Sequence, residues 1–210
     1  MKILLVICFL CSAPQFSYGK EGNINTTMFK GSKRLWALYQ DNVASQIQSP
    51  NITQFNGANG ASFGTDMGMP FSFVFGLSYY QNKDVRVAWK GTPNTPIEFY
   101  GYLMYAGIKA TMVVGFFQPW IGAGYSLGVF TMSNPADRDS NNAMIAIYSR
   151  GSRTASGPFG FGGIDFHMGS SGIRLSYSLQ QISTDPAVEI SNQSYNMTMA
   201  QYGVGIFADY

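Results

Sequence analysis

The chain has 210 residues, a formal net charge of +2 and only 11% charged residues, whereas a soluble domain usually carries about 25%. So little charge disfavours an ordinary cytosolic globule, and the near-neutral balance leaves no basic surface of the kind that binds nucleic acid. The 46% of apolar residues argues against a disordered chain. Because no apolar run after the N-terminus reaches the roughly 18 residues of a membrane helix, the composition favours a membrane β-barrel.

The first nineteen residues have the pattern of an export signal. Lys2 supplies the positive start, residues 3–10 form an apolar run too short to span a bilayer, and Ser17 and Gly19 place small residues at a cleavage site. We expect residues 1–19 to be removed, residues 20–32 to form an N-terminal extension and residues 33–210 to form one domain. Both cysteines, Cys8 and Cys11, lie in the signal, so no disulfide and no cysteine-based zinc site is expected in the mature chain.

Apolar residues alternate with small or polar residues along most of the remaining chain, as in half-buried β-strands. The alternation is clearest over residues 71–79 and 100–114. The polar residues 51–60 are expected to form a loop, and residues 81–84 a tight turn. We therefore predict eight strands, over residues 33–47, 71–79, 85–90, 100–114, 119–129, 157–168, 173–180 and 194–210.

The connections between these strands alternate in length. Those after the first, third, fifth and seventh strands are long or polar, and the others are only a few residues long. Outer-membrane barrels have short periplasmic turns and longer external loops. Because backbone groups in lipid must all be paired, the sheet must close on itself. The predicted fold is a closed, antiparallel, eight-stranded up-and-down transmembrane β-barrel with both termini on the periplasmic side and an interior filled by side chains.

The C-terminal strand has one apolar face that ends in an aromatic residue. This face comprises Tyr202, Val204, Ile206, Ala208 and Tyr210. It resembles the signal by which the outer-membrane assembly machinery recognises bacterial barrels. The alternative interpretation is the last strand of a secreted β-sandwich that happens to end in tyrosine.

Two further stretches resemble the opacity-type and OmpA-like eight-stranded outer-membrane barrels. Residues 75–80, with the following turn and residues 85–87, are similar to the second hairpin of that family. Residues 118–125 (QPWIGAGY) are similar to its fifth-strand motif. The resemblance covers most of residues 70–210. It implies a place in the bacterial outer membrane and contact with lipid and lipopolysaccharide. The family often has a glutamate shortly after the third-strand arginine, but Ala88 stands there.

Strand parity points several charged side chains into the lumen, close to the short turns. The predicted lumen network comprises Arg86, Lys109, Asp165, His167, Arg174 and Asp209. Asp165 and Arg174 flank one hairpin and should be neighbours. Closure of the barrel should bring Asp209 near Lys33 and Arg34. Because opposite charges offset the cost of burial, we expect a charged plug rather than an open pore.

His167 is the only histidine and raises the alternative of a hydrolase. The lipid A deacylases, which share this barrel size, have a His-x-Ser arrangement that the sequence after His167 does not match. Glycine-rich residues 157–163 lack the Lys-Ser/Thr and the helix of a phosphate-binding loop. We therefore expect no enzymatic activity, no catalytic residue, no bound metal and no cofactor.

The favoured function is that of a surface-exposed outer-membrane anchor whose loops contact the environment or a host. An apolar run in an otherwise polar loop is the predicted contact patch, although it also fits an early start of the sixth strand. The patch comprises Met144, Ile145, Ile147 and Tyr148. The alternative function is a narrow, porin-like channel for small or hydrophobic solutes, because a wide porin needs about 16–18 strands.

Overall fold

The computed structural model describes residues 33–48, 52–55, 57–89, 92–133, 153–184 and 195–210. The expected signal and N-terminal extension lie outside these residues. The described strands are β1 (Lys33–Gln48), β2 (Ile52–Phe55), β3 (Asn59–Met67), β4 (Phe71–Trp89), β5 (Thr92–Thr111), β6 (Phe117–Ser133), β7 (Arg153–Met168), β8 (Ser171–Thr184) and β9 (Tyr195–Asp209). In this part of the chain, no helix has the length and apolarity needed to cross a membrane.

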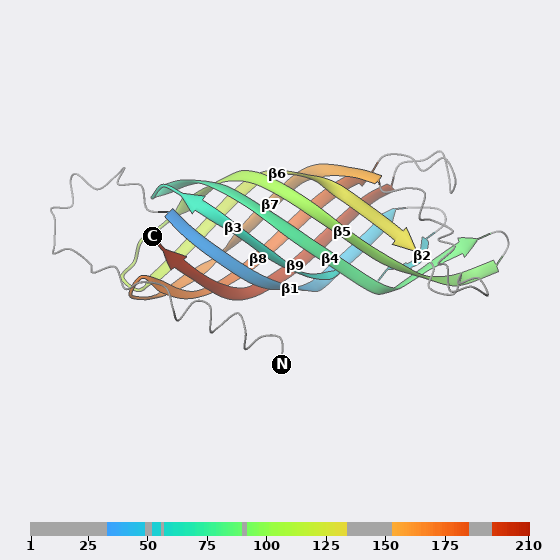
Figure 1. Ribbon diagram of the computed structural model, residues 1–210, viewed down its shortest axis with the longest axis horizontal. Coiled ribbons are helices and arrows are strands. Elements are labelled where there is room, and N and C mark those ends of the chain that lie inside the picture. The colour runs from blue at the N-terminus through green and yellow to red at the C-terminus, as the bar shows by residue number, and fades with distance from the viewer. Residues whose placement is uncertain (1–32, 49–51, 56, 90–91, 134–152, 185–194) are drawn as a thin grey trace, which may run out of the picture.

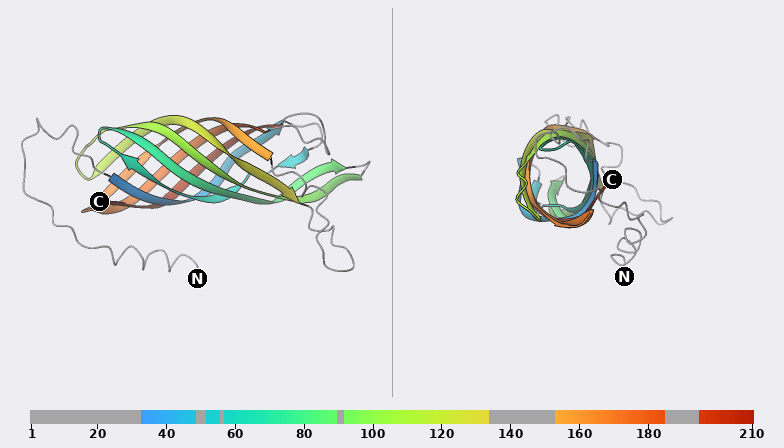
Figure 2. Two further views of the ribbon diagram at one scale, coloured as in Figure 1. Left: turned by 45° about the horizontal axis from the view of Figure 1, so that its top comes forward. Right: turned by 90° about the vertical axis from the view of Figure 1, so that its left-hand side faces the viewer.

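Eight of the strands close into a barrel in which neighbours run antiparallel. Their hydrogen-bonded order is β4-β3-β1-β9-β8-β7-β6-β5, and β4 also pairs with β5, so the sheet returns to itself. The strands are tilted along the barrel in Figure 1 and form a ring in the end-on view of Figure 2. The short β2 pairs with β4 beyond the end of β3. The predicted fold class, a closed antiparallel eight-stranded barrel, is confirmed.

The assignment of two strands was wrong, although the number of barrel strands was right. The predicted turn at residues 81–84 does not exist, because β4 continues through it and still pairs with β5. The missing strand is β3, which the sequence analysis left partly in a loop. Its inward positions are Gly60, Ser62 and Gly64, so the contrast between its two faces is weak. Polar residues 81–84 continue a strand because β4 there has passed beyond its apolar outward face, which ends near Tyr79.

The two ends of the barrel differ in their connections. At one end, here called the short-turn end, residues 68–70, 112–116 and 169–170 join consecutive strands. The start of β1 and the end of β9 lie at this same end, where the Tyr210 amide donates to the Lys33 carbonyl at 2.9 Å. The opposite end is the loop end. There, β4 and β5 extend as a paired ribbon, so residues 92–99, expected in a long or polar connection, belong to β5.

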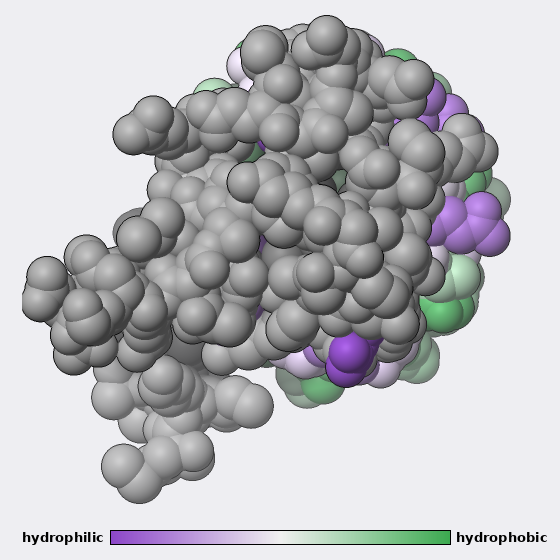
Figure 3. Space-filling model, turned by 90° about the vertical axis from the view of Figure 1, so that its right-hand side faces the viewer, coloured by the Kyte–Doolittle hydropathy of each residue, from purple (hydrophilic) through white to green (hydrophobic). Residues whose placement is uncertain are grey.

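The outer wall carries an apolar band, as expected of strands that alternate between lipid and lumen. Phe71, Phe73, Ile108 and Ile121 are each more than 60% exposed. Toward the loop end, exposed tyrosines join this band on β1, β5, β6, β8 and β9, and leucine and valine follow them on β6. Seen from the loop end, hydrophobic and hydrophilic side chains of the described residues adjoin along the rim (Figure 3). The outward tyrosines match the aromatic girdle of membrane barrels.

Inside the barrel, large aromatic side chains lie over glycines of neighbouring strands. A Cβ on Gly76 would collide with the Tyr105 ring, and a Cβ on Gly64 with Trp36. A barrel of eight strands has an interior only wide enough for side chains. The inward glycines are therefore what allows rings of this size to fit, which explains their alternation with outward apolar residues.

The loop end of the lumen is filled by a hydrophobic cluster, here called the apolar plug. Phe99 and Phe130 stack with their centroids 4.7 Å apart, and Phe55 of β2 packs edge-on against Phe99. The members of the plug are Ala58, Tyr80, Val85, Phe99, Leu103, Phe130, Ala155, Ile182, Met197 and Met199. Because these are inward positions of six barrel strands and the segment before β3, the plug extends across the lumen.

Candidate functional site

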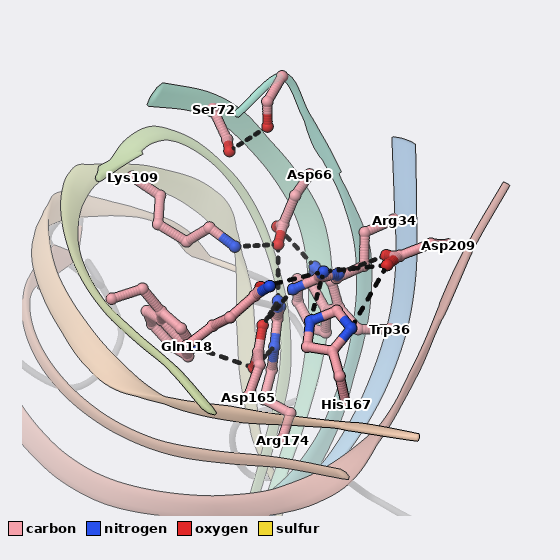
Figure 4. Close-up of polar contacts among 12 residues, drawn as sticks. Arg34, Trp36, Asp66, Ser72, Lys109, Gln118, Asp165, His167, Arg174 and Asp209 are labelled. Atoms are coloured by element: carbon pink, nitrogen blue, oxygen red, sulfur yellow. Dashed lines mark hydrogen bonds and ion pairs between the residues drawn. The ribbon is translucent and has the colours of Figure 1, made fainter. Parts of the chain in front are cut away.

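Six charged side chains meet inside the barrel near its short-turn end. Each comes from a different strand: β1, β3, β5, β7, β8 or β9 (Figure 4). Three are basic and three are acidic, so the group is neutral as a whole. We call this group the charged layer; it comprises Arg34, Asp66, Lys109, Asp165, Arg174 and Asp209.

The centre of the charged layer is the pair formed by Asp165 and Arg174. They lie directly opposite each other in the β7–β8 ladder. The Arg174 Nε donates to Asp165 Oδ1 at 2.8 Å, and its Nη2 donates to Oδ2 at 2.8 Å. This two-point geometry is the strong form of an arginine–carboxylate contact. Both side chains are almost completely buried, so the pair is shielded from solvent.

Asp66 joins this pair to a third cation. Its Oδ2 accepts a hydrogen bond from Arg174 Nη2 at 2.7 Å and also pairs with the Lys109 ammonium. Its Oδ1 accepts from the Trp36 indole at 2.9 Å. Both oxygens of this buried carboxylate are therefore satisfied, as a charge removed from water requires.

Arg34 connects the centre of the layer to the rim of the barrel. Its Nη1 donates to Asp165 Oδ2 at 2.5 Å, and its Nε donates to Asp209 Oδ1 at 2.6 Å. Its Nη2 contacts His167 Nε2 at 2.9 Å and reaches Asp209 Oδ2 at 3.1 Å. A weaker contact of 3.4 Å joins the same nitrogen to the Gln118 side-chain oxygen. Arg34 thus holds β1 to β7 and β9, across the seam where the barrel closes.

Aromatic rings complete the surroundings of the cations. The Trp120 indole donates to Asp165 Oδ1 at 3.0 Å. The Arg174 guanidinium carbon lies 5.4 Å from the Trp36 ring centroid and 5.1 Å from that of Trp120. The Arg34 guanidinium carbon lies 4.2 Å from the Phe207 ring. Such contacts stabilise cations that have lost water.

The structure brings together five of the six residues predicted for the lumen network. Lys109, Asp165, Arg174 and Asp209 belong to the charged layer, and His167 borders it. Arg86 does not, which corrects the sequence analysis. It lies beyond the last pairing of β4 with β3 and opposite Gln54 of β2, at the loop end. The turn predicted at residues 81–84 had put Arg86 near the short-turn end instead.

Two members of the charged layer were not among the candidate site residues. Arg34 was expected only as a neighbour of Asp209, and the structure pairs these two across β1 and β9. Asp66 was missed because its strand was missed. A usable signal was present: Phe63 and Met67 alternate with Gly64 and Asp66 just before Gly68 and Pro70.

The two other groups of candidate residues lie elsewhere. The C-terminal face points outward on β9, with Tyr202, Val204 and Tyr210 each at least 45% exposed; its role as an assembly signal stays a prediction. The proposed contact patch, Met144, Ile145, Ile147 and Tyr148, lies outside the described residues.

His167 borders the charged layer. Its ring contacts Arg34, lies 3.8 Å from Asp209 and sits against Phe207 with centroids 4.7 Å apart. Within the described residues, no group of three or more histidine, cysteine or acidic side chains is arranged to bind a metal ion.

Comparison with known proteins shows a similarity of fold. No family model and no curated protein matches its sequence. Among solved structures it is similar to the Neisserial surface protein A, with a TM-score of 0.54 and 13% identity over 86% of this chain and 97% of that one. The outer-membrane protein OprG of Pseudomonas aeruginosa gives 0.52 and 10% identity over 88% and 98%.

The N-terminal β-barrel domain of Pseudomonas aeruginosa OprF is similar at a TM-score of 0.50, with 12% identity over 87% of this chain and 99% of that one. At these identities the likeness concerns the fold. It agrees with the closed sheet, the outward apolar band and the tyrosine girdle described above. The chain is an eight-stranded β-barrel with the fold of bacterial outer-membrane proteins.

Proposed function

We propose that the protein is a closed outer-membrane anchor that presents its loop end to the outside, rather than a channel. The observation that carries this proposal is that the lumen is blocked twice, by the charged layer at the short-turn end and by the apolar plug at the loop end. A solute would have to disrupt both in order to pass.

The space between the two blocks supports the same function. A cavity of about 40 Å³ lies there, bordered by Trp36, Tyr105 and Phe161 above the charged layer. One water molecule needs roughly 10–15 Å³ of such space, so the cavity has room for a few waters. It is far smaller than the pockets of roughly 300–1,000 Å³ that hold small-molecule ligands.

The orientation follows from the connections. Short turns of outer-membrane barrels face the periplasm and long loops face outward, which supports our assignment of the loop end, with the β4–β5 ribbon, to the cell surface. Lipid and lipopolysaccharide surround the outer wall, the assembly machinery receives the C-terminal face, and the loops contact the environment or a host. Met144, Ile145, Ile147 and Tyr148 are the residues we propose for that contact.

Conductance of the purified protein in planar bilayers tests the closed state. The unmodified protein should give no steady conductance. A variant that weakens both blocks, Arg174→Ala with Phe99→Ala, should conduct, whereas each single variant should stay closed because the other block remains. A large steady current through the unmodified protein would contradict the proposal and favour the narrow channel.

The surface role has its own test. Replacing Met144, Ile145, Ile147 and Tyr148 with serine and asparagine should reduce adhesion of cells that display the protein, while heat-modifiability on gels, which reports barrel closure, stays unchanged. A loss of heat-modifiability would show that the run is part of the barrel. Unchanged adhesion with a normal barrel would remove these residues from the proposed contact surface.

A further inference from the structure

A groove opens on the outer wall at the loop-ward end of β3. It measures about 590 Å³ and is lined by two tyrosines, three side-chain amides, and glycine and alanine residues. Its lower part lies outside the lumen, because Tyr39, Ala61 and Tyr79 are outward-facing positions of β1, β3 and β4. This volume falls within the range of pockets that hold small ligands.

The lower part of the groove is lined by two tyrosines with an alanine between them. Tyr39, Ala61 and Tyr79 are direct register partners across the three strands. Adjacent strands lie about 4.8 Å apart, so the two tyrosines start roughly 10 Å from each other. A ring in van der Waals contact with both faces needs about 7–8 Å between them. The alanine between the tyrosines leaves that space open, and we call these three residues the tyrosine slot.

The neighbouring side chains leave the slot open. Tyr79 is paired with Tyr102 on the far side, with centroids 5.0 Å apart. The carboxylate of Asp41 is turned toward β9, where it accepts a hydrogen bond from the Tyr202 hydroxyl at 2.8 Å. None of the described residues that line the groove is charged.

Amide groups form the upper part of the groove. Asn59 and Gln81 are register partners two positions nearer the loop end than Ala61 and Tyr79, on the same outward face. The Asn59 side-chain oxygen accepts a weak hydrogen bond from the Asn42 backbone N–H at 3.4 Å. Asn82 is tied to the Gly57 carbonyl and closes the inner wall. An amide both donates and accepts hydrogen bonds, so this row suits a ligand with several hydroxyl groups.

These features fit the ring of a sugar. Its C–H face would pack against the electron-rich face of a tyrosine, and its hydroxyls would reach the amides. A phosphate group would meet no cation in the described lining and would lose its hydration without compensation. The slot lies where the apolar band ends, at the depth of the lipid headgroups. We propose that the tyrosine slot and its amide row bind the uncharged hexose of a membrane glycolipid.

Native mass spectrometry of the detergent-solubilised protein tests this proposal. The probes are a monohexosyl diacylglycerol and a phosphatidylglycerol with the same acyl chains. The protein should retain the hexosyl lipid about tenfold more strongly, the size of effect expected from two ring contacts. Equal retention of the two lipids would overturn the proposal.

Matched variants locate the site. Ala61→Leu fills the slot and should abolish the preference, while Ala123→Leu, an equally outward alanine on β6, should keep it. Heat-modifiability of both variants checks that the barrel has closed, and Tyr39→Ala provides a second probe if Ala61→Leu fails to fold. Retention of the preference by folded Ala61→Leu or Tyr39→Ala protein would overturn the site. Full displacement of the lipid by dissolved methyl hexoside would show a soluble ligand and overturn the choice of a lipid.

Discussion

At the short-turn end of the lumen, six charged side chains from six strands hydrogen-bond to one another. At the loop end, the lumen is filled by Phe99, Leu103, Phe130 and their apolar neighbours. Both regions close the same narrow barrel, but through different kinds of interaction. The charged layer depends on a few directional contacts, each between strands distant in sequence, whereas the apolar plug depends on the total area and volume that it fills.

The difference has a consequence for how each region tolerates change. Apolar side chains can be exchanged for others of similar volume at modest cost. A buried ion pair behaves otherwise, because removal of one partner leaves a charge without compensation. The charged layer should therefore be sensitive to single substitutions and the plug more tolerant of conservative ones.

The largest effect is expected for Arg174→Ala. This change leaves Asp66 and Asp165 buried with less compensation, and loss of one partner of a buried pair typically costs about 3–5 kcal/mol. The free energy of unfolding should fall by that amount, measured by urea titration of the protein in lipid vesicles. A loss below about 1 kcal/mol, the value typical of an exposed pair, would show that the layer is hydrated rather than buried.

Leu103→Ala should come next. Leu103 is fully buried in the plug, and truncation of a buried leucine usually costs about 2–5 kcal/mol. The same titration measures it, with Leu103→Met as the conservative control, which should lose less than about 1.5 kcal/mol. Equal losses for the alanine and methionine variants would mean that the plug is as specific as the charged layer.

A smaller and graded effect is expected within the charged layer itself. Asp66 lies between Lys109 and Arg174 and its side chain is 4% exposed, whereas that of Asp209 is 24% exposed. Asp66→Asn should therefore lower the unfolding free energy by about 3 kcal/mol, and Asp209→Asn by about 1 kcal/mol, because water screens the rim. The reverse order would place the centre of the layer at the rim.

The smallest expected quantity is the coupling between the two regions. Arg174 and Leu103 share no hydrogen bond or cluster in the described residues. The losses of the double variant should equal the combined single losses to within about 0.5 kcal/mol. A coupling above about 1 kcal/mol would show that the side chains between the two regions, such as the stacked Trp36 and Tyr105 rings, transmit strain between them.

Much of the fold was predictable because a membrane barrel repeats one simple rule. Outward residues must be apolar and inward residues must be small or polar, so alternation marked β9 almost to its ends and β6 and β8 to within four residues, but it missed the first eight residues of β5. The same rule fails at the loop end, where the outer wall leaves the membrane. There, residues 81–84 look like a turn although β4 continues through them, and Arg86 was misplaced as a result.

The candidate site was also predictable only in part. Parity and hairpin pairing were enough to expect Asp165 beside Arg174, since these two face each other across a short turn. Asp66 lies on a strand with glycine, serine and alanine at alternate positions, so periodicity alone did not reveal it. The tyrosine slot was not anticipated at all, because Ala61 and Tyr79 are eighteen positions apart in the chain and were not assigned to neighbouring strands.

By itself, the sequence determined the class of protein, the number of barrel strands and the inward or outward direction of most side chains, because these follow from local alternation and from the demand that every backbone group in lipid be paired. Only the tertiary structure decided which residues of neighbouring strands lie opposite each other, and that β3 is the strand between β1 and β4. That arrangement brings Arg34, Asp66 and Asp165 together and opens the slot between Tyr39 and Tyr79, since these contacts depend on register between strands and not on any local pattern.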